Sequence, residues 1–203
     1  MKLYYAKGAC SLAPHIALLD AGLPHQLVRV DLGSHRTEDG DDYLNVNPKG
    51  YVPTLVIDAG QRLTEAAVVL QYIADRKPGT LAPEQGTFPR YQLMEWLNFI
   101  ATEIHKGFGP LWHPDASDAS RAPVVKQLGK RFTIVEAALA QHPFLTGERF
   151  TIADAYLYTV TNWAPTLKVD LTAWPALRAF MARVASRPAV QRALQQEGLA
   201  RAA

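Results

Sequence analysis

Cysteine, net charge and long apolar runs are all scarce in this sequence. Its 203 residues include a single cysteine, Cys10. One cysteine excludes an intramolecular disulfide and a cysteine-rich metal site, so we expect no metal cofactor. Lys and Arg together number 21 against 19 for Asp and Glu. That balance gives no electrostatic reason to expect nucleic acid or an anionic membrane as a partner.

Signals for membrane insertion and for secretion are missing as well. No apolar run approaches the roughly 20 residues of a transmembrane helix. Residues 1–5 lack the apolar core and the cleavage site of a secretory signal. Apolar residues make up 48% of the chain and charged residues 20%, which is an ordinary globular composition. We therefore expect a soluble, reduced, cytoplasmic protein.

The first third of the chain alternates strand and helix patterns. Short apolar or alternating runs predict four strands, over residues 3–6, 26–32, 54–57 and 62–63. Two longer apolar runs predict helices, over residues 11–21 and 65–76. Segment 33–42 is polar, contains two glycines and is predicted to be a loop. This order predicts a small α/β domain in residues 1–77.

The rest of the chain is predicted to be helical. Prolines and glycines gather in residues 78–88, a composition typical of a linker. Beyond it, apolar residues recur at spacings of three and four, and Thr151 with Asp154 forms a capping box that starts a helix. A last apolar stripe begins at Pro175 and ends near Pro188. Residues 89–203 are therefore expected to form an all-helical domain.

Cys10 occupies a position where a thiol is often reactive. It follows a short strand and a turn, and it precedes the helix predicted from Ser11. Unpaired backbone N–H groups and the positive end of a helix dipole favour the thiolate, so we expect a lowered thiol pKa. The alternative is a buried structural cysteine that packs as a small apolar residue.

Five stretches spread over most of the chain form a pattern in a fixed order. They are KLYYAKGACSLAPHIAL (2–18), NPKGYVPTL (47–55), LTEAAVVLQYIAD (63–75), EWLNFIATEIHKGFGPL (95–111) and FTIADAYLYT (150–159). Together they resemble the cytosolic glutathione transferases, and in particular the bacterial beta class, which carries a cysteine near its N-terminus. The resemblance implies an α/β plus all-α fold. Its N-terminal domain would be thioredoxin-like, with a mixed four-stranded sheet and helices, and would bind glutathione. The helical domain would contribute the electrophile site.

The resemblance also assigns residues to the glutathione site. Glu65 would pair with the ammonium of the γ-glutamyl group, and the N–H groups at Ala66 and the next residue would hold its carboxylate. Without the resemblance, Glu65 reads as a helix-dipole partner. Relatives usually carry Ser where Ala66 stands, so we expect weakened but retained binding, because one hydroxyl contact is worth on the order of 1 kcal/mol.

Two further segments would contact glutathione. Val52–Pro53 matches a cis-proline step whose preceding residue pairs with the cysteinyl backbone of glutathione, as an added strand would. His35 stands where relatives often place a lysine near the glycine carboxylate. A solvated loop histidine is the alternative for His35.

Two roles are open to Cys10 in such a site. It would either stabilise the glutathione thiolate by a hydrogen bond or form a mixed disulfide with glutathione. Ser11 is a second candidate beside it, since other classes activate the thiol through an N-terminal Tyr or Ser. Tyr4 and Tyr5 are expected to be strand residues instead.

The helical domain adds further candidates. His105 would support thiolate formation or donate to a leaving group, and Lys106 beside it would contact glutathione. The alternative for His105 is a dipole partner near a helix end. The electrophile pocket is expected to be apolar, although each of its candidates could equally be core; they are Phe108, Leu111, Trp112 and Trp163.

The function expected is conjugation of reduced glutathione to hydrophobic electrophiles, in detoxification, by a homodimer. An alternative keeps the fold and uses Cys10 through a mixed disulfide, as a glutathione-dependent thiol transferase, reductase or reductive dehalogenase. A non-catalytic binding or regulatory protein on the same fold is a third possibility. The departures at Ala66 and His35 favour that third possibility, and the set of Cys10, Glu65, Pro53 and His105 opposes it.

Overall fold

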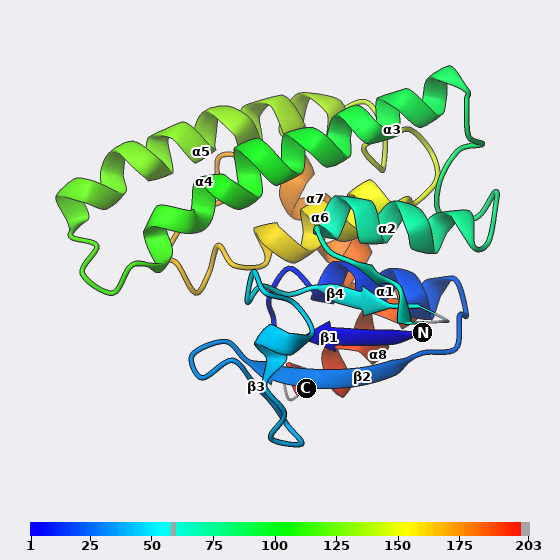
Figure 1. Cartoon of the computed structure of the whole chain (residues 1–203). Coiled ribbons are helices and arrows are strands. Elements are labelled where there is room, and N and C mark those ends of the chain that lie inside the picture. The colour runs from blue at the N-terminus through cyan, green and yellow to red at the C-terminus, as the bar shows by residue number, and fades with distance from the viewer. Residues whose placement is uncertain (58–59, 200–203) are drawn as a thin grey trace. The chain divides into compact units, whose positions relative to one another are not determined.

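The computed structural model describes residues 1–57 and 60–199. These residues form two compact units (Figure 1). One comprises Met1–Ala82 together with the chain from Ser186 onward, and the other comprises Pro83–Ala185. Residues 58–59 and 200–203, which fall within the predicted domain limits, lie outside the described residues. The functional limits 1–77 and 89–203 stay a prediction.

A mixed sheet forms the centre of the first unit, in the order β3-β2-β1-β4-β5. Strand β1 runs parallel to β2 and antiparallel to β4, and β3 and β5 extend the two edges antiparallel. The strands are β1 (Lys2–Tyr5), β2 (Gln26–Asp31), β3 (Arg36–Thr37), β4 (Thr54–Val56) and β5 (Arg62–Leu63). The predicted mixed α/β architecture is confirmed.

The prediction of four strands was wrong by one, because segment 33–42 contains β3. The Asp31 carboxylate accepts hydrogen bonds from the N–H groups of Gly33 at 2.9 Å and Ser34 at 2.8 Å and so closes a turn after β2. That turn returns Arg36 and Thr37 to pair with the end of β2. Two polar residues are too few to show the alternation by which a strand is recognised in a sequence.

Three helices complete the first unit: α1 (Leu12–Asp20), α2 (Ala66–Asp75) and α8 (Pro188–Gln196), with a short 3-10 turn, η1 (Tyr43–Asn45). Helix α1 is buried along most of its length because it packs against both α2 and α8. Gly22, at a φ of 65°, follows it at the predicted stop.

Helix α8 was not predicted, because Pro188 was taken as the end of a helix. Pro188 is instead its first residue, a position that tolerates proline. A buried pair ties α8 to α1: His15 Nδ1 lies 2.9 Å from Glu197 Oε1. The other oxygen of Glu197 accepts a hydrogen bond from the N–H of Gly8 at 2.9 Å. The last described turn of the chain therefore braces the turn that carries Cys10.

The second unit is helical, as predicted. Its elements are α3 (Phe88–Phe99), a π-helical turn η3 (Ile100–His105), α4 (Lys106–Phe108), a 3-10 turn η4 (Gly109–Trp112), α5 (Asp118–Leu139), α6 (Ile152–Thr161) and α7 (Pro175–Ala185). Every residue of α6 is buried, because α3, η3 and α7 all pack against it. Over the described residues, no helix is long and apolar enough to span a membrane.

The start of α6 confirms the predicted capping role of Asp154. Its buried carboxylate accepts hydrogen bonds from the N–H of Leu145 at 2.9 Å, the N–H of Thr151 at 2.7 Å and the Thr151 hydroxyl at 2.8 Å. Burial raises the pKa of Asp154 to about 6, although these three bonds act to lower it. This carboxylate therefore fixes where the central helix of the unit begins.

Candidate functional site

The thiol of Cys10 lies at the junction of two predicted glutathione-binding segments. Cys10 is partly buried in the turn before α1, and its S–H donates a hydrogen bond to the carbonyl oxygen of Val52 at 3.1 Å. The Val52–Pro53 peptide bond is cis, which confirms that prediction. Segments 42 residues apart in the chain thus meet at a single sulfur atom.

The expected lowering of the thiol pKa was wrong. Burial raises the pKa of the Cys10 thiol to about 12, and the Glu65 carboxylate also raises it. The N–H groups of Cys10 and Ser11 act in the predicted direction, toward a lower pKa. The loss of hydration outweighs them, because a thiolate removed from water loses more than two backbone donors return.

Ser11 has a different environment from the one expected. It is fully buried, and its hydroxyl lies 3.2 Å from both the nitrogen and the carbonyl oxygen of Ala6 at the end of β1. Those contacts favour a structural role, in which Ser11 joins the strand to the helix. A role for Ser11 in binding glutathione stays a prediction.

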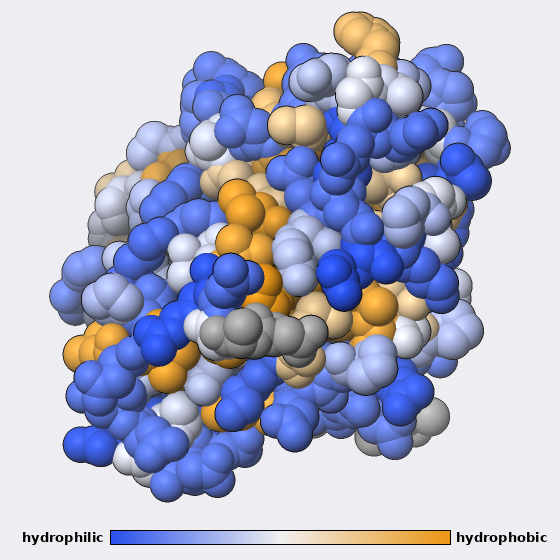
Figure 2. Space-filling model, turned by 45° about the vertical axis from the view of Figure 1, so that its right-hand side comes forward, coloured by the Kyte–Doolittle hydropathy of each residue, from blue (hydrophilic) through white to orange (hydrophobic). Residues whose placement is uncertain are grey.

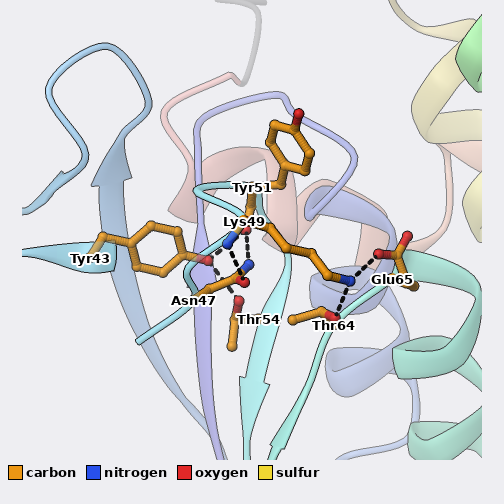
Figure 3. Close-up of polar contacts among 7 residues, drawn as sticks. All are labelled: Tyr43, Asn47, Lys49, Tyr51, Thr54, Thr64 and Glu65. Carbon is orange, nitrogen blue, oxygen red and sulfur yellow. Dashed lines mark hydrogen bonds and ion pairs between the residues drawn. The ribbon is translucent and has the colours of Figure 1, made fainter. Parts of the chain in front are cut away.

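Glu65 stands at the start of α2 with a carboxylate that is 67% exposed. Its backbone has a φ of 66°, a conformation that a residue with a side chain rarely adopts and that often marks a functional position. Lys49 Nζ lies 2.7 Å from one Glu65 oxygen and 3.1 Å from the hydroxyl of Thr64 (Figure 3). Ala66 follows as the first, buried residue of α2.

Sequence reasoning missed Lys49, which a polar network positions beside Glu65 (Figure 3). Asn47 accepts from the N–H of Lys49 at 3.1 Å and donates to the carbonyl of Tyr51 at 2.7 Å. That carbonyl also accepts from the Tyr43 hydroxyl at 2.7 Å, which leaves the Thr54 hydroxyl to donate to Tyr43. The Asn-Pro-Lys-Gly turn was the available signal, but a turn in a sequence does not tell where its lysine points.

His35 is not a simple solvated loop residue. It is partly buried, its φ is 54°, and its ring lies against Gly50, where an added Cβ would come within 2.8 Å of Cε1. Within the described part of the chain, its buried Nδ1 has no hydrogen-bond partner. A buried polar atom without a partner is uncommon and is consistent with a ligand or water contact.

In the second unit, His105 is the last residue of the π-helical turn η3. Its Nδ1 lies 2.7 Å from the hydroxyl of Tyr156, which sequence reasoning missed. Trp163 lies edge-on to the imidazole, with ring centroids 5.0 Å apart. The histidine therefore has a defined ring position.

The predicted electrophile residues differ in exposure. Phe108 and Leu111 are buried, with Phe108 stacked edge-on against Trp163 at 5.8 Å between centroids. Trp163 is also buried, whereas Trp112 is 51% exposed and lies 5.7 Å from Trp163. Lys106 is exposed. These positions favour core packing for Phe108 and Leu111, and their roles in a pocket stay predictions.

These features define a class of protein: a thioredoxin-like unit with a cysteine at a helix start, a cis-proline step and an acidic helix start, joined to a helical unit. The chain belongs to the glutathione S-transferase family. Residues 8–76 match the family model of the glutathione S-transferase N-terminal domain, and residues 99–188 match that of the C-terminal domain.

Comparison with individual relatives identifies the class within this family. The chain is 50% identical to the glutathione S-transferase GstA of Escherichia coli O157:H7, over 98% of this chain and 100% of that one. It matches a structure of a sphingomonad glutathione S-transferase complexed with glutathione at a TM-score of 0.94 and 44% identity, covering 98% and 100% of the two chains. The structure of a beta class glutathione S-transferase of Sphingomonas chungbukensis matches at a TM-score of 0.94 and 42% identity, with the same coverage of the two chains. The resemblance to the beta class is confirmed.

Within the described residues, no cluster of three or more His, Cys, Asp or Glu side chains could hold a metal ion.

Proposed function

We propose that this chain is a glutathione transferase that conjugates reduced glutathione to hydrophobic electrophiles. The observation that carries the proposal is the hydrogen bond of 3.1 Å from Cys10 to the carbonyl of Val52. It brings the thiol at the start of α1 to the backbone group expected to bind the cysteinyl part of glutathione. A ligand bound there as an added strand would place its own sulfur near Cys10.

Glutathione would engage the first unit through both of its ends. The ammonium of the γ-glutamyl group would pair with Glu65, and its carboxylate would lie at the first-turn N–H groups of α2, beginning at Ala66. In the structure, the Glu65 carboxylate is paired with Lys49. The ammonium of glutathione would displace the Lys49 ammonium from this pair, and Lys49 could then contact an anionic group of glutathione. His35 is the candidate contact for the glycine carboxylate, supported by its unpartnered Nδ1 among the described residues.

Cys10 would act as a hydrogen-bond donor and not as a nucleophile. Burial keeps its thiol protonated at neutral pH, and its S–H already donates to Val52. When the cysteinyl N–H of glutathione donates to the Val52 carbonyl, the S–H of Cys10 would turn to the glutathione sulfur. The glutathione thiol would release its proton to solvent, and the Cys10 S–H would stabilise the resulting thiolate. That thiolate would attack the electrophile and displace its leaving group, and the conjugate would leave without a bond to the protein.

The second unit would supply the remaining groups. His105 would donate a hydrogen bond to developing negative charge, and Lys106 would add positive charge for a carboxylate of glutathione. Trp112 is the candidate for contact with the electrophile because much of its ring is exposed. We also propose a cytoplasmic homodimer that serves in detoxification.

Calorimetric titration with reduced glutathione tests the proposal. Wild type and Cys10→Ala should both bind, because the main contacts of the ligand lie outside the thiol, and only wild type should conjugate an aromatic halide efficiently. If wild type does not bind glutathione, the proposal of a transferase is wrong and the non-catalytic alternative remains.

The mixed-disulfide alternative is tested by mass spectrometry of the protein incubated with oxidised glutathione, whose disulfide Cys10 would attack with release of one reduced glutathione. The single cysteine makes the assignment unambiguous. We expect unmodified protein, because a protonated buried thiol attacks a disulfide slowly. An adduct of one glutathione on Cys10 would instead establish thiol-transfer chemistry.

A further inference from the structure

The long helix that carries His105 changes its winding just before that residue. Helix α3 ends at Phe99, the six residues of η3 are π-helical, and α4 resumes at Lys106. A π-helical turn is rare and is found frequently at functional sites, since it inserts a residue and rotates the side chains that follow. The turn therefore sets the direction in which the side chain of His105 points from the helix.

Tyr156 meets the imidazole where this turn ends. Its side chain is buried in the middle of α6, and its hydroxyl lies 2.7 Å from His105 Nδ1. The two rings are nearly perpendicular, at 85°, with centroids 5.8 Å apart. The ring of Trp163 also contacts the imidazole, with centroids 5.0 Å apart and an interplanar angle of 65°. The two aromatic rings and the hydrogen bond to Nδ1 thus fix the position of the imidazole.

Tyr156 is itself held in place by the start of its helix. Asp154, two residues earlier, binds Leu145 and Thr151 and fixes where α6 begins. All residues of α6 are buried, so the helix has little room to shift. The phenol is therefore a rigid partner for His105.

The direction of the bond follows from its length and from the acidity of the two groups. A separation of 2.7 Å is typical of an O–H donor, whereas N–H donors centre nearer 2.9–3.0 Å. A phenol is also a stronger acid than a neutral imidazole N–H. The Tyr156 hydroxyl therefore donates, Nδ1 accepts, and in the neutral ring the hydrogen resides on Nε2.

We propose that Tyr156 is a positioning residue that holds neutral His105 in the Nε2–H tautomer, so that His105 serves the reaction as a hydrogen-bond donor through Nε2. The inference rests on the proposed transferase function and specifies the chemistry of one of its groups. In this form Nε2 cannot accept a proton from the glutathione thiol. It donates to the thiolate or to the charge that develops on a leaving group.

Histidine-selective ¹⁵N NMR at about pH 8, where an ordinary imidazole is neutral, measures the tautomer directly. Assignment comes from His105→Ala, whose spectrum lacks one ring. In wild type, the two ring nitrogens of His105 should give widely separated shifts with the hydrogen on Nε2. In Tyr156→Phe, the two shifts should move toward each other, because the second tautomer becomes populated.

Kinetics on the same proteins link the tautomer to the reaction. For Tyr156→Phe we expect kcat to fall about three- to tenfold, as for loss of one neutral hydrogen bond. The KM for glutathione should stay within about twofold of wild type, because a positioning residue acts on the chemical step.

Tyr158→Phe is the matched control. Tyr158 is another buried tyrosine of α6, and a spacing of two residues places it roughly 200° around the helix from Tyr156. Its variant should keep both the tautomer of His105 and kcat.

The outcomes separate this inference from the proposed function. A wild-type spectrum with the hydrogen on Nδ1, or an unchanged tautomer in Tyr156→Phe, would overturn the inference even if the enzyme is fully active. A changed tautomer with unchanged kcat would also overturn it. Failure of wild type to bind glutathione would instead refute the transferase proposal. The wild-type spectrum decides the tautomer even if Tyr156→Phe folds poorly.

Discussion

At Cys10, two opposite effects act on one thiol. Backbone N–H groups at the start of α1 favour the thiolate, but burial dominates and raises the pKa to about 12. The group is therefore protonated at neutral pH. We expect the alkylation rate of the free protein by iodoacetamide to rise about tenfold per pH unit from pH 7 to 10, since only the thiolate reacts. The single cysteine makes the rate a measurement of this site alone.

Glu65→Gln provides the control for that profile. The Glu65 carboxylate raises the pKa of Cys10, so its neutral replacement should lower the pKa and speed alkylation at every pH below the midpoint. A plateau in the wild-type rate below about pH 9 would contradict the buried, protonated thiol.

Ala66 is, with His35, one of the two positions at which the sequence departs from the family's pattern in the proposed ligand site. A serine there would add a hydroxyl at the first turn of α2, where a bound carboxylate can accept from it. We expect Ala66→Ser to tighten glutathione binding by about 1 kcal/mol, or roughly fivefold, in a calorimetric titration. Ala67→Ser, one residue further along the helix, is the comparison. Equal affinity of wild type and Ala66→Ser would show that this position does not contact the ligand.

At the scale of single elements, Asp154 links the start of α6 to pH. Its pKa is raised to about 6 in the folded protein from an ordinary value of 3.8. The folded state therefore holds this proton more tightly than the unfolded state. The contribution to stability is fully present below about pH 4 and is lost as the pH rises through about 6.

Asp154→Asn removes that titration. It also leaves one of three donors without an acceptor, so the free energy of unfolding should fall by about 1–3 kcal/mol at pH 4.5. The difference between wild type and variant should narrow at pH 7, where wild type has lost its protonated-state advantage. Urea unfolding of both proteins at each pH measures this difference in the free energy of unfolding. Because the two proteins are compared at equal pH, the contributions of the other titrating groups cancel. A difference that widens toward pH 7 would contradict the raised pKa.

Some elements were predictable from the sequence, and others were not. Helices α1 and α2 are apolar runs that were predicted to within one or two residues at each end, and α6 begins at its predicted capping box. Strand β3 has two residues, α8 begins at a proline, and η3 interrupts a helix without any change in apolar spacing. Neither β3 nor η3 leaves a signal in hydrophobic periodicity. Helix α8 is amphipathic, with Val190 and Ala193 on its buried face, and it was missed because Pro188 was read as the end of a helix.

The candidate site divides in the same way. Cys10, Pro53 and Glu65 were recognisable because their local sequence matches a family pattern, and the cis bond at Pro53 came from that resemblance alone. Lys49 and Tyr156 were missed because their partners are distant, at Glu65 and His105. The pKa of Cys10 was predicted with the wrong sign because the dipole is a local property, whereas burial depends on the whole unit.

At the scale of the whole molecule, one apolar stripe on α3 lacks an explanation within a single chain. On the face shown in Figure 2, most side chains are hydrophilic, and apolar side chains reach the surface in patches. Phe88, Tyr91 and Met94 recur every three residues and are 74%, 59% and 39% exposed. Large apolar side chains gathered on one helix face mark a surface for association. Two copies would meet with little repulsion, since the net charge is +2.

We therefore expect the wild-type chain to sediment as a dimer at micromolar concentration, in line with the homodimer proposed above. Tyr91→Glu combined with Met94→Glu should yield a monomer, because each copy would bury two charges without partners. Leu32→Asp is the matched control: it adds a charge at an apolar residue that is 43% exposed in the first unit, and it should leave the dimer intact. Circular dichroism verifies that each variant is folded. A monomeric wild type, or a double variant that remains dimeric, would place the association surface elsewhere than on α3.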